Sequence, residues 1–208
     1  AVSFTSLPVY WDYQAMLEYR PTPRDRFRLA FLGSDDSFVL VFNRPPDNAP
    51  RFSGSFSSAI GFHTSQLLWD HTFSPTLSHR ATFSVGRNQI NFGGGEAFGI
   101  DLAFWQITGR YELTWQFMRR ARPTPGLDIL GGPAPITFNG IRPPTEGQPF
   151  DPANTARVAT NATDTVYRPG AYAELELTPN SRLRLVPSVR VDYTRDADRS
   201  WTVAPRFS

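Results

Sequence analysis

The residues best suited to chemistry in this sequence are charged side chains spaced two positions apart. They are Arg110, Glu112, Glu174, Glu176, Arg182, Arg184 and Arg190. A spacing of two puts side chains on the same face of a β-strand. Opposite charges on neighbouring strands then form cross-strand ion pairs, each worth about 0.2–1 kcal/mol. The pattern predicts either a track of charges that guides a ligand or a ladder of ion pairs that makes a wall polar, and we favour the second.

Three evenly spaced histidines, His63, His71 and His79, invite comparison with a metal site. His71 and His79 flank the segment 74–77 and could be neighbours across a turn. A zinc site, however, needs three or four converging ligands, and the chain contains no cysteine. We therefore expect histidines at the surface near a turn, with no metal and no cofactor.

Two further features carry weaker chemistry. Gly93–Gly95 lacks the lysine and hydroxyl of a phosphate-binding loop and predicts a hinge in a loop. Asp35 and Asp36 could bind a cation, but they are more typical of a solvated strand end. No Ser-His-Asp order and no carboxylate pair with an evident acid partner stands out, so we expect no enzyme.

The elements that position these groups are indicated by the stretch 103–117, AFWQITGRYELTWQF. Its odd positions are mostly aromatic or aliphatic, and its even positions are mostly polar or charged. This alternation predicts a β-strand with one apolar and one polar face. The strand would be more than twice the usual length of roughly 5 or 6 residues. Such a strand fits a wall with lipid on one side and water on the other.

Two tryptophans, Trp105 and Trp115, fix the height of this apolar face. At about 3.3 Å per residue and a tilt near 40°, the rise between them is roughly 25 Å. That is about the height of the lipid-facing band of outer-membrane barrels, which has an aromatic girdle at each edge. We therefore expect Ile107, Tyr111 and Leu113 to face lipid, and Thr108, Arg110 and Glu112 to face a wet lumen.

The composition is compatible with this interpretation. The 208 residues are 40% hydrophobic and 14% aromatic, with a net charge of +2 and a mean hydropathy of −0.35. No run of about 18 apolar residues predicts a transmembrane helix, but alternation also hides a membrane strand from hydropathy averages. Both signs of charge are interspersed, so we expect no nucleic-acid partner.

Similar alternation recurs along the whole chain. It predicts strands over 10–20, 26–42, 60–73, 79–92, 167–177 and 182–194, and a last one from residue 201. Pro187 should disturb the strand that contains it, because proline donates no ladder hydrogen bond. The segment 124–138 is rich in proline and glycine, so its pairing should be interrupted or bulged.

Short and long connections alternate between these strands. Short turns are expected near 21–25, 74–77, 118–122 and 178–181, and longer loops near 43–55, 93–99, 139–164 and 195–200. Outer-membrane barrels have short periplasmic turns and long extracellular loops. The sequence therefore predicts an all-β fold, an antiparallel up-and-down meander of about nine long strands that forms part of a larger transmembrane β-barrel.

The two ends point to a piece of such a barrel. The first strand runs into a short turn, so the chain would enter from the extracellular side, whereas a complete bacterial barrel normally starts in the periplasm. A complete barrel also has an even number of strands, and the count here is about nine. We expect residues 1–208 to be a partial outer-membrane β-barrel domain without a plug domain, a signal peptide or a C-terminal strand.

Two segments resemble a known family. They are YRPTPRDRFRLAFLGSDD (19–36) and LTPNSRLRLVPSVRVDYTRDADRSWTVAPRFS (177–208). The second contains R-x-D-Y, a short loop and W-x-x-x-P-R, carried by Arg190, Asp192, Tyr193, Trp201, Pro205 and Arg206. This arrangement is similar to that of TonB-dependent outer-membrane receptors.

The resemblance implies a 22-stranded barrel plugged by an N-terminal domain in the outer membrane of a Gram-negative bacterium. Such receptors import scarce ligands, for example ferric siderophores, cobalamin or sugars, with energy passed on by TonB. The implied partners are outer-membrane lipid, the plug domain and remaining strands, and TonB acting through the plug. Ligand choice would lie in the extracellular loops and the plug.

Two alternatives remain open from the sequence. One is a different outer-membrane barrel, a porin or a lipid-modifying enzyme, and the enzyme would need a serine or histidine dyad near the lipid-facing rim. The other is a soluble β-rich binding domain, which would have to cover the apolar face of every long strand with a second layer.

Overall fold

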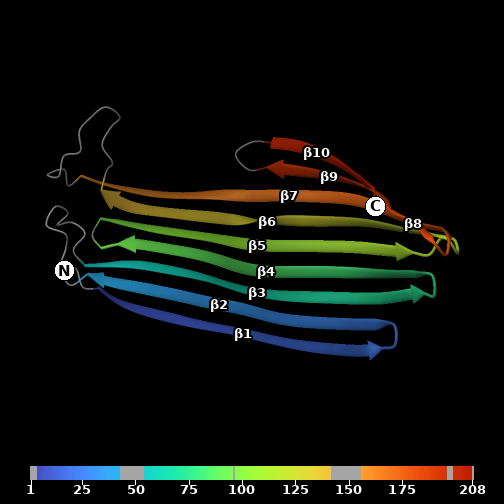
Figure 1. The fold of residues 1–208 in the computed structure, drawn as a ribbon, viewed down its shortest axis with the longest axis horizontal. Coiled ribbons are helices and arrows are strands. Elements are labelled where there is room, and N and C mark those ends of the chain that lie inside the picture. The colour runs from blue at the N-terminus through green and yellow to red at the C-terminus, as the bar shows by residue number, and fades with distance from the viewer. Residues whose placement is uncertain (1–3, 43–53, 96, 142–155, 196–198, 208) are drawn as a thin grey trace.

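The chain folds into one antiparallel sheet of ten strands (Figure 1). This computed structural model describes residues 4–42, 54–95, 97–141, 156–195 and 199–207. The strands are β1 Phe4–Thr22, β2 Asp25–Phe42, β3 Gly54–Ser74, β4 Leu77–Gly94, β5 Phe98–Trp115, β6 Ala121–Ile141, β7 Arg157–Asn180, β8 Leu183–Leu185, β9 Pro187–Arg195 and β10 Arg199–Phe207. In these ranges no helix is long and apolar enough to cross a membrane.

Strands that follow one another in sequence lie side by side in space. The order is β1-β2-β3-β4-β5-β6-β7-β9-β10, with β8 paired to β7. The predicted meander of about nine spans is confirmed, because β8 and β9 continue each other across Val186, which lies outside both strands. The interruption falls next to Pro187, as expected of a residue with no backbone N–H.

The sheet has two distinct ends, which we name by their connections. At the turn end, on the right of Figure 1, short turns join β1 to β2, β3 to β4, β5 to β6 and β7 to β8. At the loop end, on the left, β2 is joined to β3 and β6 to β7 by the longer segments 43–53 and 142–156. The alternation predicted for short and long connections is confirmed at these positions.

The long loop expected near 93–99 is wrong. β4 continues to Gly94 and β5 begins at Phe98, and Ala97 N donates a hydrogen bond to Gly94 O at 2.9 Å. Gly95 adopts a φ of 54°, a left-handed conformation that glycine takes without steric cost. The glycine run therefore provides a tight hairpin turn and not a long loop.

The connection expected over 139–164 is shorter than predicted. β6 reaches Ile141 and β7 starts at Arg157, and the two strands pair without a register shift from Ala121–Leu177 to Ile141–Arg157. Small and polar residues in 157–164 lack the two-residue alternation that predicts a strand. They form a strand because their backbone groups are paired in the ladder, whatever their β-propensity.

The interruption predicted in 124–138 is confirmed on one side of β6 only. Its ladder to β5 has a gap between the pairs Leu102–Ile136 and Ile107–Gly131, whereas its ladder to β7 is continuous. Pro133 and Pro135 lie in the gap, and Gly132 has a φ of 148°. Pro133 and Pro135 have no backbone N–H to donate to β5, so the ladder between β5 and β6 is interrupted at these residues.

The register keeps side chains of equal parity together over the whole sheet. Tyr13 pairs with Gly33, Gly33 with His63, His63 with Arg87 and Arg87 with Trp105. Because paired residues point to the same side of an antiparallel sheet, odd-numbered residues share one face, the odd face, and even-numbered residues share the other, the even face. We call the row formed by Tyr13, Gly33, His63, Arg87 and Trp105 the crossover row.

Between the crossover row and the turn end, the odd face is apolar and the even face is polar. The exposed apolar side chains on the odd face include Leu17, Leu67, Phe83, Ile107, Leu127, Ile129 and Val189. Aromatic residues edge this band. Trp11 and Tyr13 stack at the loop side with ring centroids 5.8 Å apart, and Phe27 and Trp69 stack at the turn side at 5.7 Å.

Beyond the crossover row, toward the loop end, the two faces exchange character. The odd face there carries polar residues such as Asp35, Gln89, Asn91 and Asp101, and Asn91 Nδ2 donates to Asp101 Oδ1 at 2.5 Å. The even face there becomes apolar, and we call it the upper wall. Its phenylalanines are Phe38, Phe56, Phe62, Phe92, Phe98, Phe104 and Phe138.

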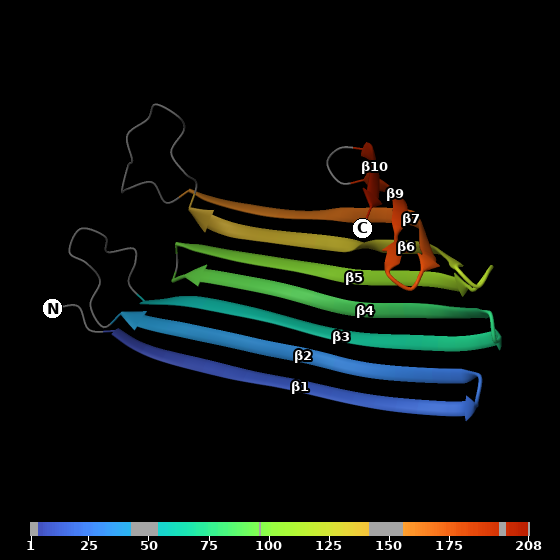
Figure 2. The ribbon, with the colours of Figure 1, turned by 45° about the vertical axis from the view of Figure 1, so that its right-hand side comes forward.

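The sheet has no second layer in the part of the chain that the structure describes. Ala30 is the apolar residue that counts as buried there, at 8% exposure, and the views in Figures 1 and 2 show no element lying across either face. A soluble sheet buries one face of this kind to stabilise itself. The bare apolar band therefore favours contact with lipid over the soluble β-rich alternative.

The band makes a direct prediction for two adjacent residues of β3. Leu67 is 43% exposed on the odd face, in the row of Phe83 and Gly109, which is midway between Trp105 and Trp115 of β5, and Gln66 lies on the even face opposite Ser84. Leu67→Arg places a charge in the hydrocarbon region and should cost about 2–4 kcal/mol of folding free energy in a bilayer. Gln66→Arg should cost far less, since its side faces water.

Urea-dependent folding of the full-length protein into lipid vesicles measures both free energies. Equal tolerance of the two arginines would show that the odd face does not meet lipid. The opposite order would show that the assignment of the two faces is inverted.

Candidate functional site

The charged residues of the even face gather around one tyrosine. Tyr172 of β7 lies among Arg110 and Glu112 of β5, Asp128 of β6, and Arg190 and Asp192 of β9, and we call this group the Tyr172 cluster. The continuous parity of the register brings these strands' even positions to one side. Two arginines thus stand among three carboxylates.

The Tyr172 hydroxyl bridges the two charged residues of β5. Arg110 Nη2 donates to Tyr172 Oη at 2.8 Å, and Tyr172 Oη donates to Glu112 Oε2 at 2.6 Å. The Arg110 guanidinium also lies over the tyrosine ring, 5.1 Å from its centroid. A cation above an aromatic face is held electrostatically by the ring quadrupole.

Arg190 of β9 makes two forked interactions, one with Asp128 of β6 and one with Asp192 of its own strand. Its Nη1 and Nη2 donate to Asp128 Oδ2 and Oδ1 at 2.7 and 2.9 Å. Its Nε and Nη2 donate to Asp192 Oδ2 and Oδ1 at 2.9 and 2.6 Å. Two parallel charge-assisted bonds fix orientation as well as distance. The guanidinium also lies 5.9 Å from the centre of the Tyr172 ring.

Two glycines make room for this arrangement. A Cβ at Gly126, the partner of Tyr172 on β6, would overlap the tyrosine ring. A Cβ at Gly170 would crowd Arg190, Asp192 and Asp128. The side chains therefore lie flat across neighbouring backbone, and the cluster depends on these glycines for space and not for backbone conformation.

Glu174 lies beside the cluster. It lines a small cavity of about 260 Å³ together with Arg110, Tyr172, Ser188, Val189, Arg190 and Arg206. This cavity is the hollow through which the cluster is accessible from the even face. Its lining carries three arginines and one glutamate, and two of the arginines, Arg110 and Arg190, are already paired with Glu112 and Asp128.

Glu176 and Arg184 form a separate group nearer the turn end. Glu176 Oε2 accepts hydrogen bonds from Arg122 Nη2 at 2.5 Å and Arg184 Nη2 at 3.1 Å. Arg182 lies in the adjoining turn, where its backbone N–H donates to Asn180 Oδ1 at 2.9 Å. These residues tie β6, β7 and β8 together across the hairpin.

The structure thus brings together part of the predicted charged set. Arg110, Glu112 and Arg190 belong to the Tyr172 cluster, Glu174 adjoins it, and Glu176 with Arg184 stands apart. Asp128, Tyr172 and Asp192 are site residues that were not predicted from the sequence. Asp128 was obscured by the surrounding prolines and glycines, although its even parity would have placed it on the charged face.

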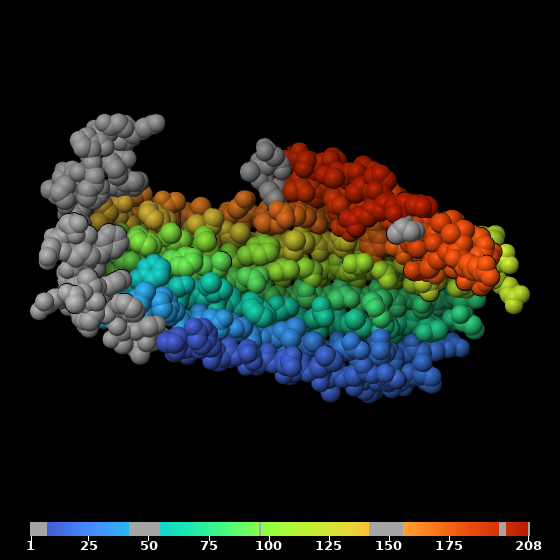
Figure 3. Space-filling model, in the orientation of Figure 1, coloured from blue at the N-terminus to red at the C-terminus, as the bar shows by residue number. Residues whose placement is uncertain are grey.

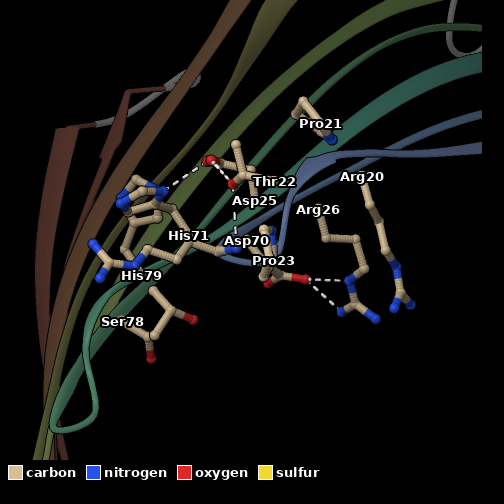
Figure 4. A pocket seen from close by; sticks show the side chains of 12 residues that line it. Arg20, Pro21, Thr22, Pro23, Asp25, Arg26, Asp70, His71, Ser78 and His79 are labelled. Carbon is tan, nitrogen blue, oxygen red and sulfur yellow. Dashed lines mark hydrogen bonds and ion pairs between the residues drawn. The ribbon is translucent and has the colours of Figure 1, made fainter.

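A larger cavity, of about 610 Å³, lies at the turn end between β1, β2, β3 and β4 (Figure 4). At its centre Asp25 accepts hydrogen bonds from Thr22 Oγ1 at 2.6 Å and Trp69 Nε1 at 3.1 Å, and His71 Nδ1 lies 2.6 Å from its Oδ1. Asp70 is bound by Arg26 and, at 2.7 Å, by Arg80. Asp25 and Asp70 are therefore already paired, and their hydrogen bonds connect the turn between β1 and β2 to β3.

The histidines do not converge on one point. His71 and His79 are register partners, as expected across the turn, with ring centroids 5.8 Å apart. His63 lies at the crossover row, 3.2 Å from Asp35 and 3.3 Å from the Tyr13 hydroxyl. Over the described residues, no group of three or more histidine, aspartate or glutamate side chains is arranged to hold a metal ion.

Fold and site together define a class of protein. A meander of long antiparallel strands, with an aromatic-edged apolar band on one face and a network of ion pairs on the other, is the wall of a transmembrane β-barrel of the outer-membrane kind.

The chain belongs to the TonB dependent receptor-like β-barrel family, whose model matches residues 8–208. Among solved structures it is similar to the outer membrane transporter YddB from Escherichia coli, with a TM-score of 0.73 and 12% sequence identity. That alignment covers 97% of this chain but 29% of the transporter, so the chain spans less than a third of the length of that protein. No curated protein sequence matches the chain.

A double-mutant cycle tests whether the Arg190–Asp128 fork stabilises the wall. The two side chains are 32% and 20% exposed, so solvent screens the pair only partly, and we expect a coupling of about 1–2 kcal/mol. The measurement is urea unfolding of Arg190→Gln, Asp128→Asn and the double variant of the full-length protein in vesicles. Arg206→Gln, in the same cavity, is the matched control and should not couple to Asp128→Asn. Additive losses for Arg190 and Asp128 would contradict the prediction.

The need for space at Gly126 is tested separately. Gly126→Ala forces the Tyr172 ring to move and should break the bridge between Arg110 and Glu112. We expect a loss of about 1–3 kcal/mol in unfolding free energy, typical of overpacking. Gly99, whose Cβ would meet nothing within 4 Å, gives the control Gly99→Ala. Equal effects of the two changes would show that the tyrosine does not depend on Gly126.

Proposed function

We propose that the chain is the barrel segment of a TonB-dependent transporter in the outer membrane of a Gram-negative bacterium, where it imports a scarce ligand such as a ferric siderophore. The odd face meets outer-membrane lipid, and the even face lines the lumen. The observation that carries the proposal is the exposed aromatic-edged band of the odd face beside the ion-paired even face. Membership of the receptor family and the transporter fold support it.

The Tyr172 cluster has a structural part in this function. Its guanidinium and carboxylate groups bind one another through forked hydrogen bonds, so they leave little capacity for a passing ligand. A polar, pre-arranged wall of this kind suits contact with a plug domain, whose surface must slide or rearrange against it. We therefore assign the cluster to the interface with the plug and expect no catalysis from it.

The remaining partners follow from the family. The rest of the barrel strands would close the sheet at β1 and β10, removing the edges that an isolated sheet exposes. TonB would act through the plug and not on the residues of this chain. The closed barrel would carry the same faces around its circumference.

Uptake by the full-length receptor tests the proposal. The receptor is produced in a Gram-negative host without its own TonB-dependent receptors, together with the TonB protein of its own source. We expect accumulation of at least one scarce nutrient from a panel that begins with ferric siderophores, and loss of that accumulation when TonB is deleted. Deletion of TonB leaves passive diffusion intact.

Two results would overturn the proposal. Equal passage of solutes with and without TonB would identify a porin. Failure of the receptor to appear in outer-membrane fractions in a heat-modifiable, folded form would exclude a membrane wall altogether.

A further inference from the structure

A hollow on the odd face is explained neither by the lipid-facing band nor by the charged even face. It has a volume of about 230 Å³ and lies between β4, β5 and β6, on the loop-end side of Trp105. We call it the β5–β6 hollow. Its polar lining residues all have odd numbers and therefore share the odd face; they are Arg87, Gln89, Asn91, Asp101 and Thr137.

The β5–β6 hollow lies where the ladder between these two strands is open. In the described ladder, residues 103–106 of β5 are not paired with β6, and Ala103 lines the hollow together with Pro135 of β6. Nearer the turn end, a Cβ on Gly132 would overlap the carbonyl oxygen of Trp105, so a glycine is needed where β6 approaches β5 so closely. The hollow is therefore a consequence of the backbone path of β6 and exists without a ligand.

The hollow begins at the height of lipid headgroups. Trp105, at the edge of the apolar band, is 44% exposed, and Ala103 and Asp101 follow it toward the loop end on the same face of β5. At roughly 3.3 Å per residue and a tilt near 40°, they lie about 5 and 10 Å beyond it. The headgroup region of a bilayer is about 5–7 Å thick on each side of the hydrocarbon core. A phospholipid headgroup would therefore reach only the lower part of the hollow, whereas a headgroup of several sugars would fill it.

The amide and carboxyl groups of the hollow are held in place by other side chains. Asn91 Nδ2 donates a hydrogen bond to Asp101 Oδ1 at 2.5 Å, and Gln89 Nε2 donates one to Asp35 Oδ1 at 3.4 Å. Each of these bonds uses one atom of a planar group, and the group has a second polar atom that can bond to a ligand. Side chains fixed in this way lose less conformational entropy when they bind.

Arg87 and Trp105 place a charge and a ring at the lower end of the hollow. The Arg87 guanidinium lies 5.9 Å from the centroid of the Trp105 ring, within the range of a cation–π interaction. A guanidinium binds a phosphate group through paired hydrogen bonds, and an exposed indole ring packs against the C–H face of a sugar. A phosphate and a sugar can therefore be held next to each other here.

The surroundings of the hollow favour a lipid as its occupant. The apolar band continues on the turn-end side, where Ile107 and Ile129 are 42% and 39% exposed, so acyl chains joined to the headgroup would lie against it. No described element crosses the sheet at this height in the ribbon views, and the face shown in Figure 3 is bare from β3 to β6. The hollow and the band thus form a polar and an apolar surface for one amphiphilic molecule.

We propose that the β5–β6 hollow binds the phosphorylated sugar headgroup of a glycolipid in the outer leaflet. Arg87 binds the phosphate, and Gln89, Asn91 and Asp101 bind sugar hydroxyls, because pairs of polar atoms on planar side chains match hydroxyls on adjacent sugar carbons. This inference rests on the proposed function, since it requires the odd face to meet the outer membrane. It concerns the outside of the wall and not the transported ligand.

Protection of a thiol tests occupancy of the hollow. This chain contains no cysteine, and any cysteine elsewhere in the full-length protein is first replaced by serine. Ala103→Cys places a thiol in the hollow. Ala59→Cys is the matched control, because Ala59 lies on the same face in the row of Asn91 and Asp101 but outside the lining.

A membrane-impermeant maleimide labels each variant in phosphatidylcholine nanodiscs, with and without a few molecules of short-chain lipopolysaccharide per disc. We expect the lipopolysaccharide to slow labelling of Ala103→Cys about tenfold when its concentration is about ten times Kd, and to leave labelling of Ala59→Cys nearly unchanged.

Recognition of the headgroup is tested by affinity. Native mass spectrometry of the folded full-length protein in detergent measures binding of the same lipopolysaccharide and of phosphatidylglycerol, an anionic lipid without a sugar ring. We expect Arg87→Gln and Asp101→Asn each to weaken lipopolysaccharide binding about tenfold or more, through the lost charge-assisted hydrogen bonds. Ser57→Ala, on the same face but outside the hollow, should have no effect. Phosphatidylglycerol should bind more weakly, and heat-modifiable mobility selects the variants that are folded.

Each outcome decides the inference. Equal protection of the two thiols would mean that lipid covers the odd face without a site, and equal binding of the two lipids would mean that charge alone is recognised. Unchanged affinity of both Arg87→Gln and Asp101→Asn would also overturn the proposal. If any of these results occurs while TonB-dependent uptake persists, the glycolipid site fails and the transport function stands. Absence of the receptor from the outer membrane would instead remove the proposed function itself.

Discussion

The structure depends on one constraint, the unbroken parity of the β-ladder. Along every long strand pair, odd-numbered residues are paired with odd-numbered residues and even-numbered with even-numbered. The parity of a residue number therefore decides on which face of the sheet its side chain lies. A single slip would move an entire strand's side chains to the other face. The register shifts in the described ladders lie between Tyr19 and Thr22, between Thr72 and Ser74 and between Leu177 and Asn180. All three fall at turns, so they do not move the side chains of a long strand to the other face.

Each face of the sheet has a different polarity on the two sides of the crossover row. Near the turn end, apolar residues cover the odd face and ion pairs cover the even face, and the Tyr172 cluster connects β5, β6, β7 and β9 across the polar side. Past the crossover row the polarity reverses. Trp, Tyr and His, which combine an apolar body with a polar atom, occupy the boundary, as Tyr13 and His63 do beside Asp35. Phenylalanine, which has no such atom, is the aromatic residue of the upper wall.

The sequence was sufficient for the meander, the strand count and the division of β5 into an apolar and a polar face, because two-residue alternation between Trp105 and Trp115 sorts its side chains by parity. It was insufficient at Gly93–Gly95 and over 157–164, where glycine, alanine and threonine give no pattern and only ladder pairing makes a strand. The Tyr172 cluster could be foreseen in its charged members, since Arg110, Glu112 and Arg190 share parity. Their convergence on Tyr172 could not be predicted, because it depends on the registers of β5, β6, β7 and β9. The space that Gly126 leaves for the tyrosine ring also cannot be inferred from the sequence. The upper wall was not predicted because the apolar residues of β5 move from odd to even positions at Trp105. A pattern that assumes one apolar face along the whole strand does not include the residues beyond that point.

The hairpin of β9 and β10 gives the wall a rim of unequal height. β7 climbs to Arg157, but β9 ends at Arg195 opposite Tyr167, level with the last rows of the apolar band. About 33 Å of β7, at roughly 3.3 Å per residue, therefore stands above its neighbour as a step, which Figure 1 shows where β9 and β10 stop short of the loop end. In the proposed barrel, the extracellular rim would therefore be lower at this hairpin than at β7.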